Sequence, residues 1–160
     1  TTNYILTRMA DDGLSYEEAL ADAQEAGHAE ADPSLDVEGW DAANKLVILS
    51  HSVLGYPATL DQVAVEGITH VTAEMLARAT TAGKKVKLLA SAEQDGAGYR
   101  FSVRPTRLEA SHPMAQLQAK QMGIAYYTDI SGIITAAIVE ETPVPTASAM
   151  LRDVIEIYRG

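Results

Sequence analysis

The stretch HAEADPSLDVEGWDAANKLVIL, residues 28–49, joins an acidic segment to the start of an apolar helix. Lys45 is its only lysine, and five carboxylates precede it: Glu30, Asp32, Asp36, Glu38 and Asp41. Apolar residues recur at helical spacing after Asp36, which predicts a helix over residues 37–52 with Asp36 as its N-cap. Such negative charge before one cation indicates either a solvated helix face or a polar site for a small molecule.

The rest of the chain shows helix patterns in its first half and strand patterns in its second. The predicted helices cover residues 1–12, 16–26, 37–52 and 73–82, with a last helix from Pro145. A hairpin is predicted around the turn sequence DGAG, and two further strands are predicted between residues 122 and 140. Helices followed by strands are typical of an α+β (mixed α/β) fold, here with helices packed on one side of a β-sheet.

Local signals support four of these helix ends. Ser15 and Glu18 have the spacing of a capping box, in which each side chain bonds the other residue's backbone N–H. Thr72 is a suitable N-cap, and Gly27 and Gly83 follow helical segments as glycine does at C-caps. The helix bounds are therefore predicted from local chemistry as well as from apolar spacing.

Composition excludes several classes of function. The chain has 12 lysines and arginines against 22 acidic residues, a formal net charge of −10, which argues against binding nucleic acid or an anionic membrane. No apolar run reaches the roughly 18 residues of a membrane span. The absence of cysteine excludes disulfides and fits a reducing compartment. The four histidines lack metal-ligand spacing, so no metal site is predicted.

Asp41 and Lys45 are four residues apart on the predicted helix. Such a pair is often a solvated ion pair worth about 0.3–0.5 kcal/mol. The alternative is a polar site, because Lys45 adjoins an apolar surface that could partly desolvate it, and Glu30 and Asp36 could fold over the same face. Carboxylates that bind an ammonium group and a lysine that handles a proton would suit a small zwitterion. The SHS sequence at 50–52 is not a catalytic triad, since neighbouring helix side chains point apart.

Several separated segments, in one order and over nearly the whole chain, resemble the catalytic and dimerisation region of homoserine dehydrogenase. They are TTNYILTRM, EEALADAQEAGHAEADPSLDVEGWDAANKLVIL, VEGITHVT, KVKLLASA, SVRPTRL, HPMA and PTASAMLRD. The resemblance implies an oxidoreductase that interconverts L-homoserine and L-aspartate 4-semialdehyde with NAD or NADP. It also implies a role in threonine, methionine and isoleucine biosynthesis, a cytoplasmic location and a homodimer.

The resemblance implies roles for particular residues. Lys45 matches the lysine that works with Asp41 in proton transfer at the reacting oxygen. Glu30 matches the glutamate that holds the amino-acid end of the substrate, and Asp36 matches an aspartate of the same polar pocket.

Two further substrate contacts follow from the same comparison of motifs. Thr1 matches the threonine of a Gly-Thr turn that contacts substrate. His28 stands where the family commonly has tyrosine, so a histidine would make the substrate contact in place of that tyrosine.

The segment 138–143, IVEETP, replaces a stretch that is usually rich in glycine in this family.

The chain opens without methionine and already in helical periodicity, so we expect a piece of a longer protein. Residues 1–144 are expected to form the substrate-binding, catalytic and dimerisation domain. Residues 145–160 are expected to form a helix that packs on a nucleotide-binding domain preceding Thr1, which would carry most of the cofactor contacts. The isolated chain is then expected to be inactive. The alternatives are a related oxidoreductase with a different substrate or cofactor, and a non-catalytic module that binds an amino acid or only dimerises.

Overall fold

The computed structural model describes residues 1–139, 142 and 144–159. Its helices are α1 (Thr2–Asp12), α2 (Tyr16–Glu25), α3 (Ser34–Val37), α4 (Trp40–Ser52), α5 (Ala73–Thr81) and α6 (Val144–Arg159), with 3-10 helices η1 (Leu60–Gln62) and η2 (Pro113–Gln116). Its strands are β1 (Val63–Val65), β2 (Lys84–Asp95), β3 (Gly98–Glu109), β4 (Gln121–Thr128) and β5 (Gly132–Val139).

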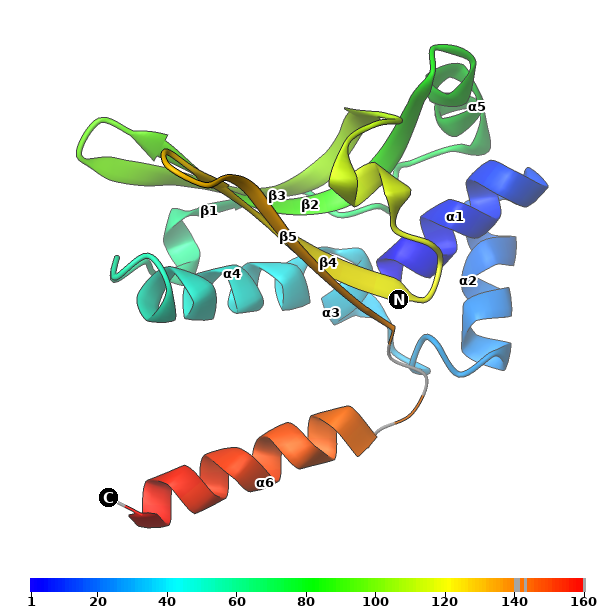
Figure 1. Ribbon diagram of the computed structural model, residues 1–160. Helices are drawn as coiled ribbons and strands as arrows, with labels where there is room; N and C mark the ends of the chain where they lie inside the picture. The colour runs from blue at the N-terminus through cyan, green and yellow to red at the C-terminus, as the bar shows by residue number, and fades with distance from the viewer. Residues whose placement is uncertain (140–141, 143, 160) are drawn as a thin grey trace.

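The strands form two separate sheets. In the larger sheet β3 lies between β1 and β2; it runs antiparallel to β2, from Asp95 opposite Gly98 to Lys84 opposite Glu109. β1 pairs with β3 in parallel, which the sequence analysis did not predict. The second sheet is the β4–β5 hairpin, which crosses one side of the larger sheet in Figure 1. The predicted hairpin around the DGAG turn and the two further predicted strands are confirmed.

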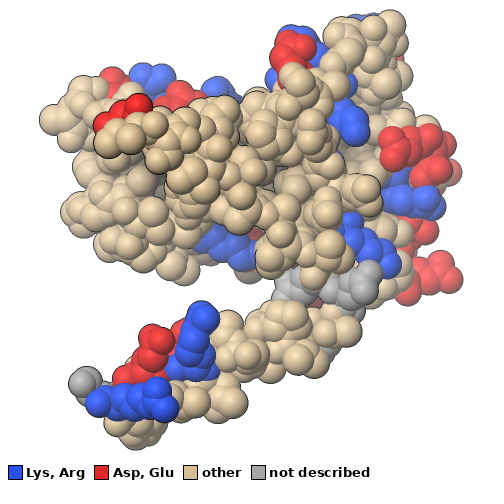
Figure 2. Space-filling model, in the orientation of Figure 1, with Lys and Arg blue, Asp and Glu red and all other residues tan. Residues whose placement is uncertain are grey.

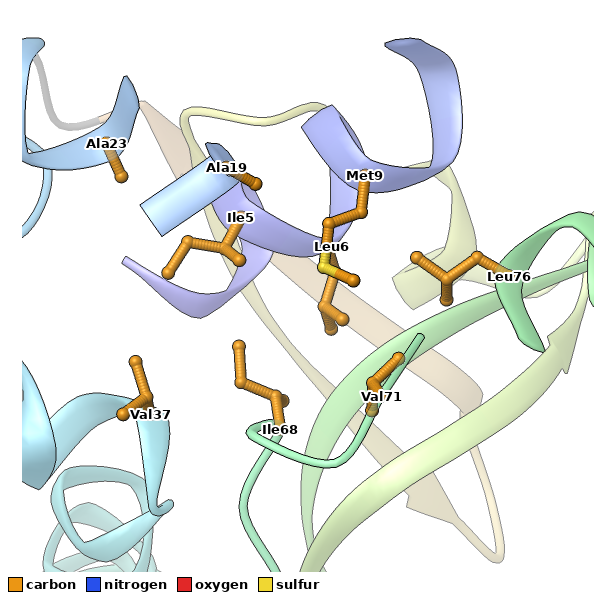
Figure 3. Close-up of a cluster of buried hydrophobic side chains, with 9 residues drawn as sticks. All are labelled: Ile5, Leu6, Met9, Ala19, Ala23, Val37, Ile68, Val71 and Leu76. Atoms are coloured by element: carbon orange, nitrogen blue, oxygen red, sulfur yellow. The ribbon is translucent and has the colours of Figure 1, made fainter. Parts of the chain in front are cut away.

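Helices α1 to α4 lie on the other side of the larger sheet (Figure 1). The main core is a cluster of side chains from α1, α2, α3, α5 and the segment before α5, which point toward one another in Figure 3. Its members are Ile5, Leu6, Met9, Ala19, Ala23, Val37, Ile68, Val71 and Leu76. The predicted α+β class, with helices on one side of a sheet, is confirmed.

The predicted helix caps are present where the local signals were strongest. Ser15 and Glu18 form a complete capping box at the start of α2. The Thr72 hydroxyl accepts a hydrogen bond from the backbone N–H of Met75, 3.2 Å away, at the start of α5. Asp36, by contrast, is not the N-cap of a long helix, because it lies inside the short helix α3.

The predicted helix over residues 37–52 is interrupted at Gly39. This glycine has φ 90°, a left-handed conformation that ends α3 and lets α4 start in a new direction. The interruption has a packing cause: a Cβ on Gly39 would lie 3.1 Å from Val103 and 3.2 Å from Val65. Strands β1 and β3 therefore press against the chain at this point, and a straight helix would not leave them room.

The C-terminal helix α6 extends away from the other elements in Figure 1, and none of its described residues is buried. Its exposed apolar residues are Val144, Met150, Leu151, Val154, Ile155, Ile157 and Tyr158. The segment 138–143, which replaces the glycine-rich stretch usual in homoserine dehydrogenases, falls largely outside the described residues, since positions 140, 141 and 143 are not among them.

Candidate active site

The start of α1 lies against the acidic segment that precedes α4. The Thr1 hydroxyl is 2.6 Å from Oδ2 of Asp36 and 2.8 Å from the carbonyl oxygen of His28, so it can donate its proton to either. Asp36, Lys45 and Asp41 all lie near enough to the backbone nitrogen of Thr1 for their charges to act on it. The fold therefore gathers the start of α1, α3 and the first turn of α4 around one point.

Asp41 and Lys45 form the predicted ion pair on α4. Lys45 Nζ is 2.7 Å from Asp41 Oδ2, and the two side chains are 62% and 34% exposed. The expectation that Lys45 would be partly desolvated is not met within this chain, because most of its side chain faces solvent. The pair lies close to Thr1 and Asp36 and can present one ammonium group to a ligand bound there.

His28 is held by two contacts at the edge of this cluster. Its ring packs on Tyr4 with ring centroids 4.5 Å apart, and its carbonyl accepts from Thr1. Burial lowers the pKa of the imidazole, and the charge of Lys120 lowers it further. His28 therefore favours the neutral form and offers a ligand a hydrogen bond rather than a charge.

Glu30 is exposed on the loop that follows α2. Its backbone carbonyl accepts from the Gln24 side-chain amide at 3.0 Å, which helps to fix the loop. Its carboxylate makes no hydrogen bond or ion pair to any residue that the structure describes. The side chain of Glu30 thus has no link to the Thr1–Asp36 contact, and its carboxylate is available to a ligand.

Chemically, the cluster combines a hydrogen-bonded carboxylate, an ion-paired lysine and a free carboxylate on a neighbouring loop. Two carboxylates can bind an ammonium group, and a lysine ammonium can donate to or exchange a proton with an oxygen atom. No group of three or more potential metal-binding side chains occurs within the described ranges.

Lys87 was not among the predicted site residues, yet it is the only buried charged residue in the described part of the chain. It lies on β2, 7% exposed, and its Nζ donates to Asn3 Oδ1 and, at 2.9 Å, to the Leu117 carbonyl. Strand alternation places it on the same face as the exposed Lys85, so no local pattern predicted its burial. Its burial comes from α1 and from the turn before β4.

Comparison with known proteins decides the family. The family model for homoserine dehydrogenase matches residues 1–155. The chain belongs to the homoserine dehydrogenase family. It is 40% identical to homoserine dehydrogenase of Synechocystis sp., over 98% of this chain and 37% of that protein. It is 38% identical to homoserine dehydrogenase of Methanocaldococcus jannaschii, over 100% of this chain and 46% of that protein.

Solved homoserine dehydrogenase structures have the same fold. The S. aureus enzyme at pH 6.0 superposes with a TM-score of 0.91 at 32% identity, covering 98% of this chain and 40% of that one. The Thiobacillus denitrificans enzyme also gives 0.91, at 34% identity, covering 99% and 37%. The chain therefore spans less than half of the length of these homoserine dehydrogenases.

The described residues do not fit a dinucleotide cofactor by themselves. The glycine-containing turn at Asp95–Gly98 connects two antiparallel strands, whereas a dinucleotide fingerprint leads from a strand into a helix whose N-terminus binds the pyrophosphate. Within the same residues, no helix has both the length and the apolar character needed to cross a membrane.

Lys87→Met is expected to change how stability depends on pH. Burial lowers the pKa of Lys87 from 10.5 to about 8, with Lys85 lowering it further and Asp11 raising it. Between pH 8 and 10.5 the unfolded chain binds more protons than the folded one, so this lysine makes folding more favourable as pH rises, by about 3 kcal/mol in total.

Thermal unfolding of wild type and Lys87→Met at pH 7 and pH 10 measures this effect. The free energy of unfolding of wild type should rise relative to that of Lys87→Met as pH rises. Lys85→Met, which changes an exposed neighbour, should show most of the wild-type rise and lose only the part that the charge of Lys85 contributes to the lowered pKa of Lys87. A constant difference between wild type and Lys87→Met across that range would show that Lys87 keeps an ordinary lysine pKa.

Proposed function

We propose that this chain is the substrate-binding, catalytic and dimerisation part of an NAD(P)-dependent homoserine dehydrogenase, which interconverts L-homoserine and L-aspartate 4-semialdehyde. The observation that carries the proposal is the convergence of Thr1, Asp36, Asp41 and Lys45 at the start of α1 in a chain of this family. With the family come a cytoplasmic location and a place in threonine, methionine and isoleucine biosynthesis, with neither nucleic acid nor membrane as a partner.

In the proposed reaction Lys45 handles the proton of the reacting oxygen. Oxidation of an alcohol by hydride loss requires a base for the hydroxyl proton, and reduction of the aldehyde requires the same group as an acid. Asp41 holds Lys45 Nζ from 2.7 Å and so orients it toward the ligand. NAD or NADP, the hydride acceptor, is assigned mainly to a nucleotide-binding domain outside this chain.

The amino-acid end of the substrate is assigned to the carboxylates. Glu30 is exposed and has no partner among the described side chains, so it can pair with the substrate ammonium group. Asp36 accepts from Thr1 with one oxygen, Oδ2, which leaves the other oxygen for a ligand. His28, packed on Tyr4, adds a neutral donor or acceptor at the edge of the site.

The decisive experiment is a homoserine oxidation assay on the full-length protein with NAD and, separately, with NADP. Formation of reduced cofactor that depends on homoserine supports the proposal. Turnover of another amino alcohol in place of homoserine would favour a related oxidoreductase. Homoserine binding without turnover would favour the non-catalytic module. Residues 1–160 alone are expected to give no turnover.

Glu30→Gln is expected to raise KM for homoserine about tenfold or more and to change kcat much less. A carboxylate that holds an ammonium group equally in the ground and transition states contributes uniform binding, and its loss appears in KM. Steady-state kinetics of the full-length protein provide the test, with Glu25→Gln, at the end of α2, as a matched control. A kcat defect with unchanged KM would contradict the assigned role.

The protein is expected to form a two-fold dimer through β4 and β5. All eight residues of β5 are exposed, and neither strand contains a charged residue. The exposed apolar side chains of the hairpin are Met122, Tyr127, Ile133, Ile134, Ile138 and Val139. A hairpin with this much exposed apolar surface is typical of an interface, and an interface between like chains uses one patch twice.

Sedimentation of the full-length protein at micromolar concentration and moderate salt measures this association. Figure 2 shows that the face carrying the hairpin is largely uncharged, while acidic side chains gather along α1 and α2, so charge repulsion should be weak at the interface. Ile134→Lys, in the middle of β5, should shift the protein toward monomer, whereas Thr135→Lys is a milder matched change. A wild-type monomer under these conditions would exclude this interface.

Helix α6 is assigned to the nucleotide-binding domain. One side of this helix is apolar, and none of its described residues is buried within the chain. A helix with an exposed apolar face requires a surface to cover it. We therefore assign residues 145–160 to contacts with that domain, and residues 1–144 to the substrate-binding unit.

A further inference from the structure

Asn3 and Lys87 form a junction of hydrogen bonds between α1, β2 and the turn before β4. Lys87 Nζ donates to the Asn3 side-chain oxygen and to the Leu117 carbonyl, and Thr7 Oγ1 lies 3.5 Å away. The Asn3 amide in turn donates to the carbonyls of Gln118, at 2.6 Å, and Gln121, at 2.8 Å. Two side chains thus bind three carbonyls of one five-residue turn.

The turn is the connection through which the hairpin meets the rest of the fold. Its own internal bonds join Gln118 and Gln121, whose backbone N–H groups each donate to the other residue. At its start, Leu117 packs against Gly123, where a Cβ would lie 3.1 Å from the leucine side chain. Displacement of the turn would therefore carry the beginning of β4 with it.

The other end of the junction is the first turn of α1. Asn3 is two residues from Thr1, whose hydroxyl contacts Asp36. Both residues belong to one helical turn, and the backbone N–H of Ile5 donates to the Thr1 carbonyl at 3.1 Å. A shift of Asn3 is consequently transmitted to Thr1 by the helix itself.

The junction is a costly arrangement for a purely structural purpose. Lys87 is 7% exposed, and among the described residues no carboxylate pairs with it. A cavity of about 160 Å³ adjoins it, lined by residues that include Thr2, Leu89 and Met122. A buried ammonium group without a counter-ion is stabilised only by the oxygens aimed at it, so its three acceptors are held in fixed positions.

We propose that Lys87 is a positioning residue of the active site, which with Asn3 couples the β4–β5 hairpin to Thr1 and so keeps Thr1 against Asp36. The inference rests on the proposed function for its kinetic consequence. If the hairpin is the subunit interface, this junction is the route by which association of two subunits orders the substrate end of the site. Lys87 itself acts through Asn3 and α1 and need not touch the substrate.

The test uses the full-length protein with Lys87→Met, which keeps the length of the side chain and removes the donors. KM for homoserine should rise about tenfold, on the scale expected for a displaced substrate contact, while kcat should change less than threefold. Lys85→Met, on the same face of β2 but exposed, should leave both constants unchanged. A folded Lys87→Met with wild-type KM would overturn the proposal.

Asn3→Ala is the second variant, which decides the matter if Lys87→Met fails to fold. Asn3 is half-buried, so its loss should be tolerated, and it removes the bonds to Gln118 and Gln121. It should raise KM in the same way. An unchanged KM in this variant also overturns the coupling.

Hydrogen exchange separates failure of this proposal from failure of the proposed function. If the wild-type protein does not oxidise homoserine, the proposed function fails, and exchange alone then tests the junction. Amides of residues 4–6 and 121–124 should exchange faster together in Lys87→Met and not in Lys85→Met. Faster exchange in only one of the two segments, or in neither, would show that the junction does not couple them.

Discussion

Replacing Lys45 with alanine in the full-length protein is expected to lower kcat for homoserine oxidation at least about 100-fold, the usual scale for loss of a general acid or base. The side chain would no longer reach the reacting oxygen, while Asp41 would remain in place as an unpaired, partly exposed carboxylate. KM should change much less, because the proposed ammonium-binding groups, Glu30 and Asp36, are untouched. Steady-state kinetics with each cofactor measure both constants.

The stability of this variant distinguishes the two interpretations of the Asp41–Lys45 pair. A surface ion pair four residues apart on a helix contributes only about 0.3–0.5 kcal/mol, so the variant should unfold within a few degrees of wild type. Arg78→Ala is a matched control, since Arg78 and Glu74 form an i,i+4 pair at 2.6 Å on α5. That control should keep full activity. A kcat close to that of wild type in Lys45→Ala would show that Asp41 and Lys45 form only a surface ion pair.

The parts of the fold that could be predicted are those with local causes. The capping box of Ser15 and Glu18, the cap at Thr72 and the turn at Asp95–Gly98 each depend on residues within four positions of one another. β1 could not be predicted, because three residues carry little pattern and the strand exists through its pairing with Phe101–Val103 of β3. Tertiary contacts decide such elements.

The same division applies to the site. The contact of Asp41 with Lys45 follows from their spacing on a helix. The contact of Thr1 with Asp36 joins residues 35 positions apart, and only the family resemblance indicated it. Lys87 and Asn3 are 84 positions apart, and neither belongs to a pattern that marks a buried pair. Contacts within the site that depend on long-range packing therefore could not be predicted from the spacing of residues in the sequence.

Gly67→Ala is expected to destabilise the protein by at least about 3 kcal/mol, the upper part of the range for overpacking in a rigid interior. A Cβ on Gly67 would lie 2.5 Å from the Cα of Glu38 and closer still to the carbonyl oxygen of Val37. These are backbone atoms, which have no rotamer to change. The carbonyl of Val37 is also fixed, since it accepts from the backbone N–H of Ile68 at 2.7 Å.

The clash of the Cβ added by Gly67→Ala with these backbone atoms can be removed only by displacing the backbone at the α3–α4 junction. Gly39, next to Glu38, is itself closed in by Val65 and Val103, so the junction cannot move toward the sheet. It would have to move outward and break the bond between Ile68 and Val37. Loss of this bond and partial exposure of Ile68, which is fully buried, add to the cost of the clash.

The displacement should also reach the candidate active site, because Asp36 lies just before the junction and Asp41 just after it. Chemical denaturation of the full-length protein measures the loss of stability, and homoserine kinetics measured well below the unfolding transition should show a raised KM. Gly98→Ala is the matched control: its φ is not positive and its Cβ would meet only the Tyr56 side chain, at 3.4 Å. If Gly67→Ala were as stable as Gly98→Ala, the backbone at the α3–α4 junction would move more easily than its packing indicates. The packing of Gly67 would then not be what holds Asp36 and Asp41 in position.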